Sequence, residues 1–329
     1  MLVLTAADVR KALPMRAAIA AVEEAYRAIS AGEAEVPLRL SLPVKPHEGV
    51  SLFMPAYVHA EGEEALTVKV VSVFPRNPAR GLPTIFAAVL VLEADTGRPL
   101  ALLEGGTLTA LRTGAASGAA TKALARPESR VLAVFGAGTQ GRTQAEAVCT
   151  VRPIERVWVY DVRREQAEAF AAEMAGWGPL PQDVRVATTP EEAVREADVI
   201  CTATIATSPV FPDAALKPGV HINGIGAYTP EMAEVPPETV ARALVVVDSR
   251  EAALAEAGDL IQPIHAGRIT PEHIHAELGE ILLGRKTGRT SPEQVTFFKS
   301  VGVAVQDAMA AQAVLRRAQA EGLGQKVSL

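Results

Sequence analysis

A glycine-rich turn followed by an acidic residue is the pattern in this chain that is best suited to chemistry. Residues 131–135 form an apolar run, VLAVF, and the sequence GAGTQG follows at 136–141. A helix-compatible stretch and a second apolar run, VWVY, come next, and Asp161 closes that run. Strand, G-x-G-x-x-G, helix, strand and acid in this order predict a binding site for a dinucleotide.

The residues of the turn have separate tasks in such a site. Gly136 allows the tight turn, Gly138 lets the backbone approach a pyrophosphate, and Gly141 lets the helix pack closely against the strand. Thr139 and Gln140 open the helix, whose N-terminus stabilises the phosphate charge. The alternative is an ordinary strand-to-helix turn, which does not account for the second strand and its acid.

Asp161 also bears on which nicotinamide cofactor binds. A carboxylate at this place accepts hydrogen bonds from the adenosine ribose and repels a 2′-phosphate, which favours NAD. Arg163 or Arg164 could still accept that phosphate, so NADP stays possible. The apolar run at 198–204 is predicted to be the fourth strand of the same sheet and to end in a ligand-facing loop. The cofactor contacts expected in this loop come from Thr202, Ala203 and Thr204.

Composition limits the classes of function that the chain can have. Its 329 residues favour two domains over one. A net charge of −6 and an aromatic content of 4% argue against a nucleic-acid partner, because a basic field and stacking platforms are both missing. Cys149 and Cys201 show no disulfide or metal spacing, and no metal site is expected. No apolar run reaches the ~18 residues of a membrane span, and the N-terminus lacks the order of a signal peptide. We expect a cytoplasmic protein with a small-molecule substrate.

The residues before the turn change from a helical to a strand pattern. A helix with Pro14 in its first turn ends near Gly32. Strand-like segments separated by Pro, Gly and Asn turns follow at 50–58, 65–74, 84–93 and 98–104. This order predicts an α+β domain with a largely antiparallel sheet. A helix rich in small residues, at 107–125, is expected to connect it to the glycine-rich turn.

Strand and helix alternate after the turn, which predicts a doubly wound parallel sheet, the Rossmann α/β fold. His273 and His275 are expected on a solvated helix face rather than in a metal site. The segment from Pro292 onward is predicted to form one long amphipathic helix, or two, that returns to the first domain. The expected domains are 1–113 with 303–329, and 114–302. The expected strands lie at 131–135, 157–160, 184–187, 198–203, 219–223 and 244–247.

Several stretches carry a resemblance that covers nearly the entire chain: LTVKVVSVFP, LTALRTGAASGAATKALA, VLAVFGAGTQG, INGIGAYTPEMAEV and FFKSVGVAVQD. Together they resemble the ornithine cyclodeaminase/mu-crystallin family. The resemblance implies that the first domain, completed by the C-terminal helix, binds substrate and forms a homodimer. It also implies hydride transfer between NAD(P) and the α-carbon of amino or imino acids. Members include cyclodeaminases, alanine dehydrogenases, ketimine reductases and Δ1-pyrroline-2-carboxylate reductases.

The resemblance assigns roles that the residues alone do not. Lys69 lies mid-strand among valines and, taken alone, is interpreted as an edge-strand lysine facing water. The resemblance implies that it reaches the substrate's carboxylate and reacting nitrogen. Arg112, alone a surface arginine or a structural ion pair, is implied to point between substrate and cofactor. The resemblance also matches Arg39 to a second carboxylate-binding arginine, Thr84 to a cleft-lining threonine and Thr113 to a cofactor contact.

Two positions depart from the cyclodeaminase pattern. Cyclodeaminases carry an aspartate where this chain has Tyr228 and a glutamate where it has Leu52. We therefore predict an NAD(P)H-dependent reductase of small cyclic 2-imino acids, such as Δ1-pyrroline-2-carboxylate or Δ1-piperideine-2-carboxylate. Lys69, Tyr228 or a bound water would keep the imine nitrogen protonated. The alternatives are an ornithine cyclodeaminase, an alanine dehydrogenase, and a non-catalytic nucleotide-dependent binding protein of mu-crystallin type.

Overall fold

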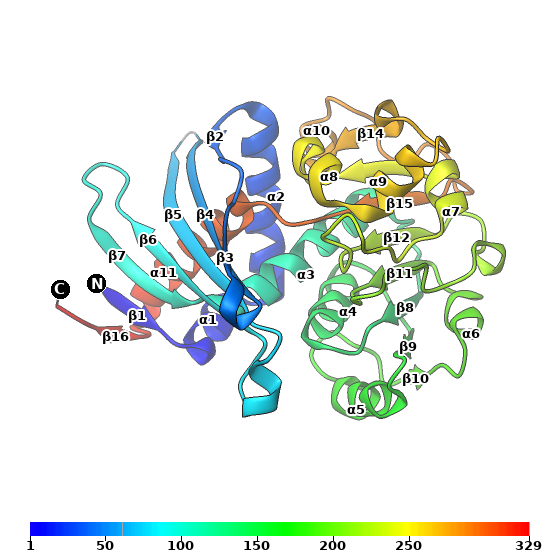
Figure 1. Cartoon of the computed structure of the whole chain (residues 1–329), viewed down its shortest axis with the longest axis horizontal. Helices are drawn as coiled ribbons and strands as arrows, with labels where there is room; N and C mark the ends of the chain where they lie inside the picture. The colour runs from blue at the N-terminus through cyan, green and yellow to red at the C-terminus, as the bar shows by residue number, and fades with distance from the viewer. Residues whose placement is uncertain (61, 329) are drawn as a thin grey trace. The chain divides into compact units, whose positions relative to one another are not determined.

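The computed structural model describes residues 1–60 and 62–328, and its contacts divide the chain into two compact units. Unit 1 comprises Met1–Arg112 and Val303–Leu329, and unit 2 comprises Thr113–Gly302 (Figure 1). The assignment of 1–113 with 303–329 to a substrate-binding and dimerisation domain, and of 114–302 to a dinucleotide-binding domain, stays a prediction. Within the described residues, no helix combines the length and the apolar character needed to cross a membrane.

Unit 1 is built on a sheet in the order β16-β1-β7-β6-β5-β4-β2, with β3 also paired to β4. All neighbouring strands are antiparallel except β1 and β7, so the predicted, largely antiparallel α+β fold is confirmed. The strands are β1 (Leu2–Leu4), β2 (Ala34–Glu35), β3 (Leu40–Val44), β4 (Gly49–Ala60), β5 (Glu63–Val73), β6 (Ile85–Leu92), β7 (Pro99–Glu104) and β16 (Gln325–Lys326).

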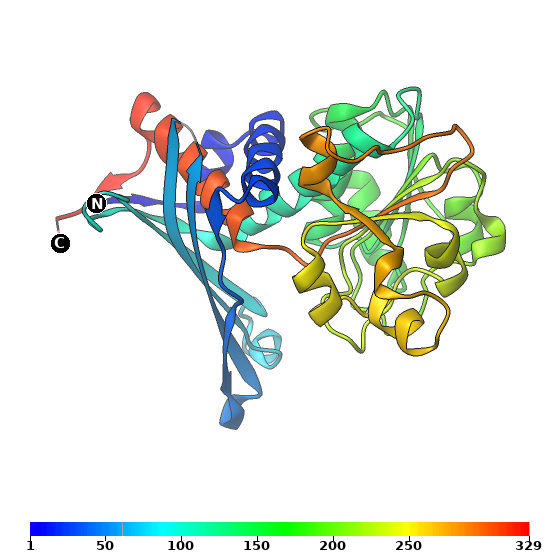
Figure 2. The ribbon, with the colours of Figure 1, turned by 90° about the horizontal axis from the view of Figure 1, so that it is seen from above.

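One face of this sheet is covered by α1 (Ala6–Ala12), α2 (Met15–Ala31) and α11 (Ala304–Glu321), which Figure 2 shows on the same side of the strands. The register places Met54, Lys69, Val89 and Leu103 directly opposite one another across β4, β5, β6 and β7. All four are buried on the helix-covered face. A lysine therefore stands in a row whose other members are apolar.

The opposite face of the same sheet is apolar but open. Pro55, Val68, Leu90 and Leu102 form the neighbouring cross-strand row, and each is only partly buried. This alternation follows from the period of two along a strand. The open row matters for assembly, because contiguous apolar surface of this kind marks interaction sites.

Unit 2 contains a wholly parallel sheet in the order β10-β9-β8-β11-β12-β15-β13-β14. The strand order reverses between β8 and β11, so the predicted doubly wound Rossmann fold is confirmed. The strands are β8 (Val131–Phe135), β9 (Arg156–Tyr160), β10 (Val184–Val186), β11 (Val199–Thr202), β12 (His221–Gly224), β13 (Leu244–Val247), β14 (Ile274–Glu277) and β15 (Thr296–Lys299).

Both faces of this sheet carry an apolar core, because successive residues of each strand point to opposite sides. In β8, Ala133 and Phe135 belong to one core, and Leu132 and Val134 belong to the other. The helices of unit 2 are α4 (Thr139–Val151), α5 (Arg164–Met174), α6 (Pro190–Val194), α7 (Pro237–Arg242), α8 (Arg250–Glu256), α9 (Gly258–His265) and α10 (Leu278–Leu282). The long helix α3 (Gly105–Leu124) contains the last residues of the first segment of unit 1 and the first residues of unit 2.

Two sequence expectations for the second half of the chain are wrong. Thr296–Lys299 is strand β15, inserted between β12 and β13, and helix α11 begins only at Ala304. Phe297 and Phe298 are both fully buried, and a short apolar run buried on both faces has no periodicity that separates strand from helix. His273 ends a 3₁₀ turn and His275 lies in β14, so the pair is not on a helix face.

Candidate functional site

Lys69 is the charged residue of the buried row in unit 1, and it is paired with an acid from the last helix. Its ammonium Nζ donates a hydrogen bond of 2.6 Å to Oδ2 of Asp307, in the first turn of α11. The side chains are 2% and 0% exposed. Strand β5 lies between β4 and β6, so the edge-strand interpretation of Lys69 is wrong.

Arg112, on α3, completes this group. Its Nε donates to Oδ1 of Asp307 at 3.1 Å, and its Nη1 donates to Oε1 of Gln306 at 2.6 Å. The amide of Gln306 in turn donates to the hydroxyl of Tyr26 on α2. One carboxylate therefore holds two cations. We call Lys69, Arg112, Gln306 and Asp307 the cation group, and helices α3 and α11 and strand β5 supply these four residues.

Burial sets the proton affinities of the cation group. Desolvation lowers the pKa of Lys69 to about 8, helped by the positive charges of Arg112 and Arg39 and opposed by Asp307. Burial by itself would raise the pKa of Asp307, but the charges of Arg112 and Lys69 outweigh that effect and hold this pKa below its ordinary value. The lysine can therefore exchange a proton near neutral pH, whereas the aspartate stays ionised.

Two further residues predicted in the substrate site lie in unit 1. Arg39 comes just before β3, is partly buried, and is close enough to lower the pKa of Lys69. Thr84 precedes β6, and its carbonyl accepts a hydrogen bond of 2.8 Å from the amide of Phe74. Within the residues that the structure describes, no hydrogen bond joins Thr84 to the cation group. Arg39 therefore lies near enough to Lys69 to act on its charge. The role of Thr84 in the substrate site stays a prediction.

The glycine-rich turn of unit 2 has the geometry that an anion site needs. Gly136 has a φ of 92°, and a side chain there would meet the carbonyl oxygen of Ala203 at 2.6 Å. A Cβ on Gly141 would lie 2.0 Å from the carbonyl oxygen of Gly136. At Gly138, by contrast, a Cβ would meet no described atom within 4 Å. Gly138 is also the N-cap of α4, and since glycine has no side chain to cap the helix, the amides of its first turn, which include Thr139 and Gln140, have no capping side chain.

Asp161 follows β9 and is held against this turn. Its Oδ2 accepts a hydrogen bond of 2.9 Å from the amide of Ala137, and its Oδ1 accepts one of 2.9 Å from the amide of Arg163. Each oxygen keeps a further lone pair. The side chains of Arg163 and Arg164 are exposed, and that of Arg164 pairs with Glu168 at 2.8 Å. The turn and the acid therefore fit the phosphates and adenosine ribose of a dinucleotide.

The remaining predicted residues of unit 2 lie at the carboxyl ends of strands or on α3. Thr202 ends β11, and Ala203 and Thr204 begin the loop that follows. Tyr228 lies in the loop after β12 and is 43% exposed. Thr113 is buried on α3, and its carbonyl accepts a hydrogen bond of 3.3 Å from the side-chain Nε2 of Gln144.

Sequence reasoning missed three buried residues. Asp307 and Gln306 lie in the stretch FFKSVGVAVQD, which carried part of the family resemblance, but their partners Lys69 and Arg112 are far away in the chain. Glu234 lies in INGIGAYTPEMAEV and is fully buried in unit 2. The signal available in the sequence was that these polar residues lie inside the two stretches that carried the family resemblance. Across residues 1–60 and 62–328, no cluster of three or more His, Cys, Asp or Glu could hold a metal ion.

Comparison with known proteins adds independent evidence. The model of the ornithine cyclodeaminase/mu-crystallin family matches residues 1–322. A Δ1-pyrroline-2-carboxylate reductase of Bacillus cereus is 44% identical over 328 residues, which cover 99% of each chain. The structure of Thermococcus litoralis Δ1-pyrroline-2-carboxylate reductase with NADH and L-proline is 43% identical, with a TM-score of 0.94 over 99% of this chain and 100% of that one. An archaeal alanine dehydrogenase dimer with bound NAD is 36% identical, with a TM-score of 0.92 over 100% and 99% of the chains.

Proposed function

The chain belongs to the ornithine cyclodeaminase/mu-crystallin family, and from this premise we propose that it is an NADH-dependent reductase of small cyclic 2-imino acids, of which Δ1-pyrroline-2-carboxylate is the first candidate. The observation that carries the proposal is the cation group, in which a buried lysine with a pKa of about 8 shares one aspartate with an arginine. Two proteins similar to this chain, at 44% and 43% identity, are named as reductases of Δ1-pyrroline-2-carboxylate.

The charge of the cation group fits a substrate with one carboxylate. Lys69 and Arg112 carry two positive charges when the lysine is protonated, and Asp307 balances one of them. Nη2 of Arg112 makes no hydrogen bond within the described chain, so it can donate to a substrate carboxylate. Arg39, which is close enough to affect Lys69, adds positive charge for the same purpose.

Lys69 supplies the proton that reduction of an imine requires. Its ammonium has three donor hydrogens, and Asp307 takes one of them. A hydrogen bond from Nζ to the imine nitrogen places positive charge there and makes the adjacent carbon electrophilic. NADH, held by the glycine-rich turn and Asp161, would supply the hydride to that carbon. One hydride and one proton complete the product, a cyclic amino acid.

Cyclodeamination of ornithine asks for more than this site offers. The substrate amine must lose a proton before oxidation, and a second amine must then displace ammonia, which calls for a base near the α-nitrogen. Leu52 and Tyr228 occupy the two places where cyclodeaminases have acids. Asp307 is a carboxylate paired with Lys69, but its lowered pKa and its two cationic partners make it a poor proton acceptor.

A spectrophotometric screen tests the proposal directly. The purified protein is given NADH and either Δ1-pyrroline-2-carboxylate or Δ1-piperideine-2-carboxylate, and in parallel assays pyruvate with ammonia, or ornithine with NAD. We expect NADH to be consumed with a cyclic imine, and little or no proline or ammonia to form from ornithine. Faster turnover with pyruvate and ammonia would assign an alanine dehydrogenase. NADH binding without turnover of any substrate would assign a binding protein.

The same proposal includes a preference for NADH over NADPH. In the proposed site, Asp161 would lie beside the adenosine ribose and would repel a 2′-phosphate. Comparing kcat/KM for the two cofactors tests this point. A preference for NADPH would mean that the exposed side chain of Arg163 controls the pocket.

We further propose that the protein forms a homodimer through the open face of the unit 1 sheet. The row Pro55, Val68, Leu90 and Leu102 offers an apolar surface that a two-fold contact would cover. The archaeal relative with 36% identity is a dimer. Replacing Leu90 with Glu should yield monomers in sedimentation, whereas the same change at Val162, a 90% exposed residue of unit 2, should not. A wild-type monomer at micromolar concentration would refute the assembly.

A further inference from the structure

Glu234, in the long loop between β12 and α7, is a fully buried acid with an unusual set of partners. Its Oε1 accepts hydrogen bonds from the amide of Thr204 at 2.6 Å and from the Thr204 hydroxyl at 2.8 Å. Its Oε2 accepts from the hydroxyl of Thr202 at 2.9 Å, and from the amides of Gly226 at 2.7 Å and Ala227 at 3.1 Å. All of these donors are neutral.

The donors belong to two loops at one edge of the parallel sheet. Thr202 and Thr204 lie where β11 ends, and Gly226 and Ala227 follow β12, its neighbour in the sheet. Ligands of such sheets bind at the carboxyl ends of the strands. The loops also approach closely, since a Cβ on Gly226 would lie 2.1 Å from the carbonyl oxygen of Thr204. The Glu234 carboxylate therefore joins both loops at the ligand edge.

Glu234 is itself fixed from behind by a buried pair of charges. Its amide donates to Oδ1 of Asp259 at 2.6 Å, and Oδ2 of Asp259 lies 3.1 Å from the ammonium of Lys299. Lys299 also donates to the carbonyl of Gly224, the last residue of β12, at 3.1 Å. Asp259 and Lys299 are both buried. The backbone of Glu234 is thus held in place independently of its side chain.

We propose that Glu234 is a positioning residue that shapes the loops after β11 and β12 into the surface that binds the nicotinamide half of the cofactor. The inference rests on the proposed function, because it takes NADH as the cofactor. The glycine-rich turn after β8 and Asp161 after β9 fit the pyrophosphate and the adenosine. The loops after β11 and β12 lie on the other side of the point where strand order reverses, and they are left for the other half of the dinucleotide.

The variant Glu234→Gln keeps the size of the side chain and removes its ability to accept hydrogen bonds with both oxygens. Glutamine has the same shape, but its amide group turns two donors toward groups that are themselves donors, so at least one loop must move. We expect the Kd for NADH, measured by its fluorescence, to rise about 10- to 100-fold, the range for loss of a buried charge-assisted hydrogen bond. The Kd for AMP, which carries only the adenosine half, should stay within about twofold of the wild type.

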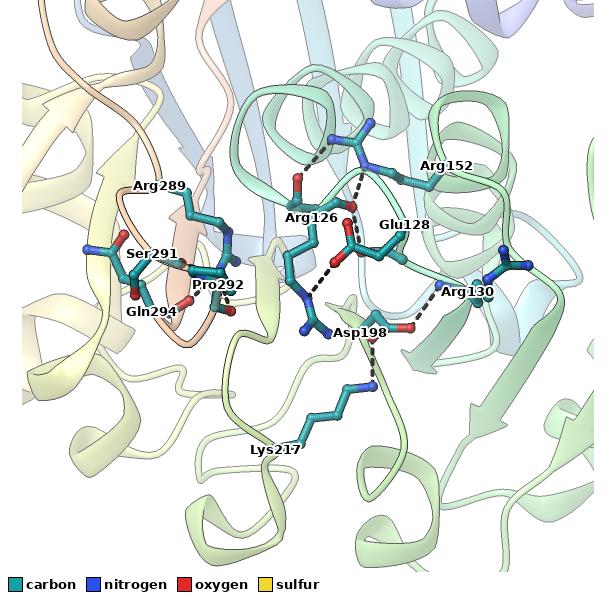
Figure 3. A network of polar contacts seen from close by, with 12 residues as sticks. Arg126, Glu128, Arg130, Arg152, Asp198, Lys217, Arg289, Ser291, Pro292 and Gln294 are labelled. Atoms are coloured by element: carbon teal, nitrogen blue, oxygen red, sulfur yellow. Dashed lines mark hydrogen bonds and ion pairs between the residues drawn. The ribbon is translucent and has the colours of Figure 1, made fainter.

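A control at the opposite end of the same sheet tests whether neutralising any largely buried acid of unit 2 weakens NADH binding. Asp198 lies just before β11 and accepts from the guanidinium of Arg126 at 2.7 Å and from the amides of Arg130 and Val131 at 2.8 and 2.9 Å (Figure 3). Its side chain also pairs with Lys217 at 2.6 Å. Asp198→Asn should lower stability and leave the Kd values of NADH and AMP unchanged.

A milder variant keeps the proposal testable if Glu234→Gln does not fold. Thr202→Val removes one hydroxyl donor and leaves Glu234 in place, so it should weaken NADH binding less, with AMP again unaffected. Equal weakening of NADH and AMP in either variant, or unchanged NADH binding, would overturn the role of Glu234. A wild-type protein that binds NADH but reduces no imine would refute the proposed reaction and leave this result standing. A wild-type protein that binds no NADH would refute both.

Discussion

Asp307 in unit 1 and Glu234 in unit 2 are both fully buried carboxylates, but the groups around them differ in charge. Asp307 accepts from an ammonium and a guanidinium, whereas Glu234 accepts only from backbone amides and threonine hydroxyls. The pKa of Asp307 is lowered because its cations outweigh its burial. The pKa of Glu234 is raised by burial and by the nearby Asp259.

The difference shows two uses of a buried acid. An acid beside cations sets their positions and their proton affinity, so it can govern groups that react. An acid beside neutral donors fixes backbone conformation and exchanges no proton with its partners. On the two proposals above, Asp307 would serve proton chemistry in unit 1, and Glu234 would shape a binding surface in unit 2.

Removing the charge of Asp307 should have the largest effect on stability. Asp307→Asn leaves Lys69 and Arg112 buried without a counter-charge, which should lower the free energy of unfolding by about 3–5 kcal/mol. Glu234→Gln leaves neutral donors unpaired and should cost about 1–3 kcal/mol. Urea denaturation of both variants measures the two values. A smaller loss for Asp307→Asn than for Glu234→Gln would break the comparison.

Arg112→Ala should affect catalysis more than any change in unit 2 that leaves the cofactor site intact. The variant loses a charge-assisted pair with the substrate carboxylate, worth about 2–4 kcal/mol in kcat/KM, or roughly 30- to 1000-fold. Arg130→Ala, which removes an exposed arginine paired with Glu155, is the control and should leave kcat/KM unchanged. A folded Arg112→Ala protein with normal activity would show that Arg112 is purely structural.

The sequence predicted some parts of this site and not others for a physical reason. The glycine-rich turn and Asp161 lie close in sequence and form a recognisable motif, so pattern alone located them. The pairing of Lys69 with Asp307 joins residues 238 positions apart, and no local pattern encodes it. Taken alone, Lys69 was interpreted as a solvated residue of an edge strand, and only the family resemblance assigned it to a substrate site. Strand β15 was missed because TFFK carries no period, and its burial depends on β12 and β13 beside it.

The pH dependence of imine reduction should report the Lys69 ammonium. Because its pKa is about 8 in the folded protein, kcat/KM at saturating NADH should fall about tenfold per pH unit above that value as the proton is lost. Lys69→Arg stays charged throughout and should show no such breakpoint, which separates the enzyme group from ionisation of the substrate. A wild-type profile that is flat to about pH 10 would exclude Lys69 as the proton donor.

The same shift has a consequence for stability. Burial lowers the pKa of Lys69 from its ordinary 10.5 to about 8. Between these values the unfolded chain binds the proton more strongly than the folded one, so the contribution of Lys69 to stability rises as pH increases. The unfolding free energy of the wild type minus that of Lys69→Met should therefore become more positive as the pH rises through that window, which denaturation at several pH values measures.

Tyr228→Phe should have the smallest effect, and it sharpens the division of tasks between the units. Tyr228 is 43% exposed in the loop after β12, and within the described residues its hydroxyl makes no hydrogen bond that would orient it or stabilise a phenolate. If Lys69 delivers the proton, losing this hydroxyl should lower kcat by less than about fivefold, and the breakpoint near pH 8 should remain. A 100-fold loss of kcat without a breakpoint near pH 8 would show that Tyr228 donates the proton and that acid–base chemistry lies in unit 2. Phenylalanine keeps the ring, so the comparison tests the hydroxyl alone.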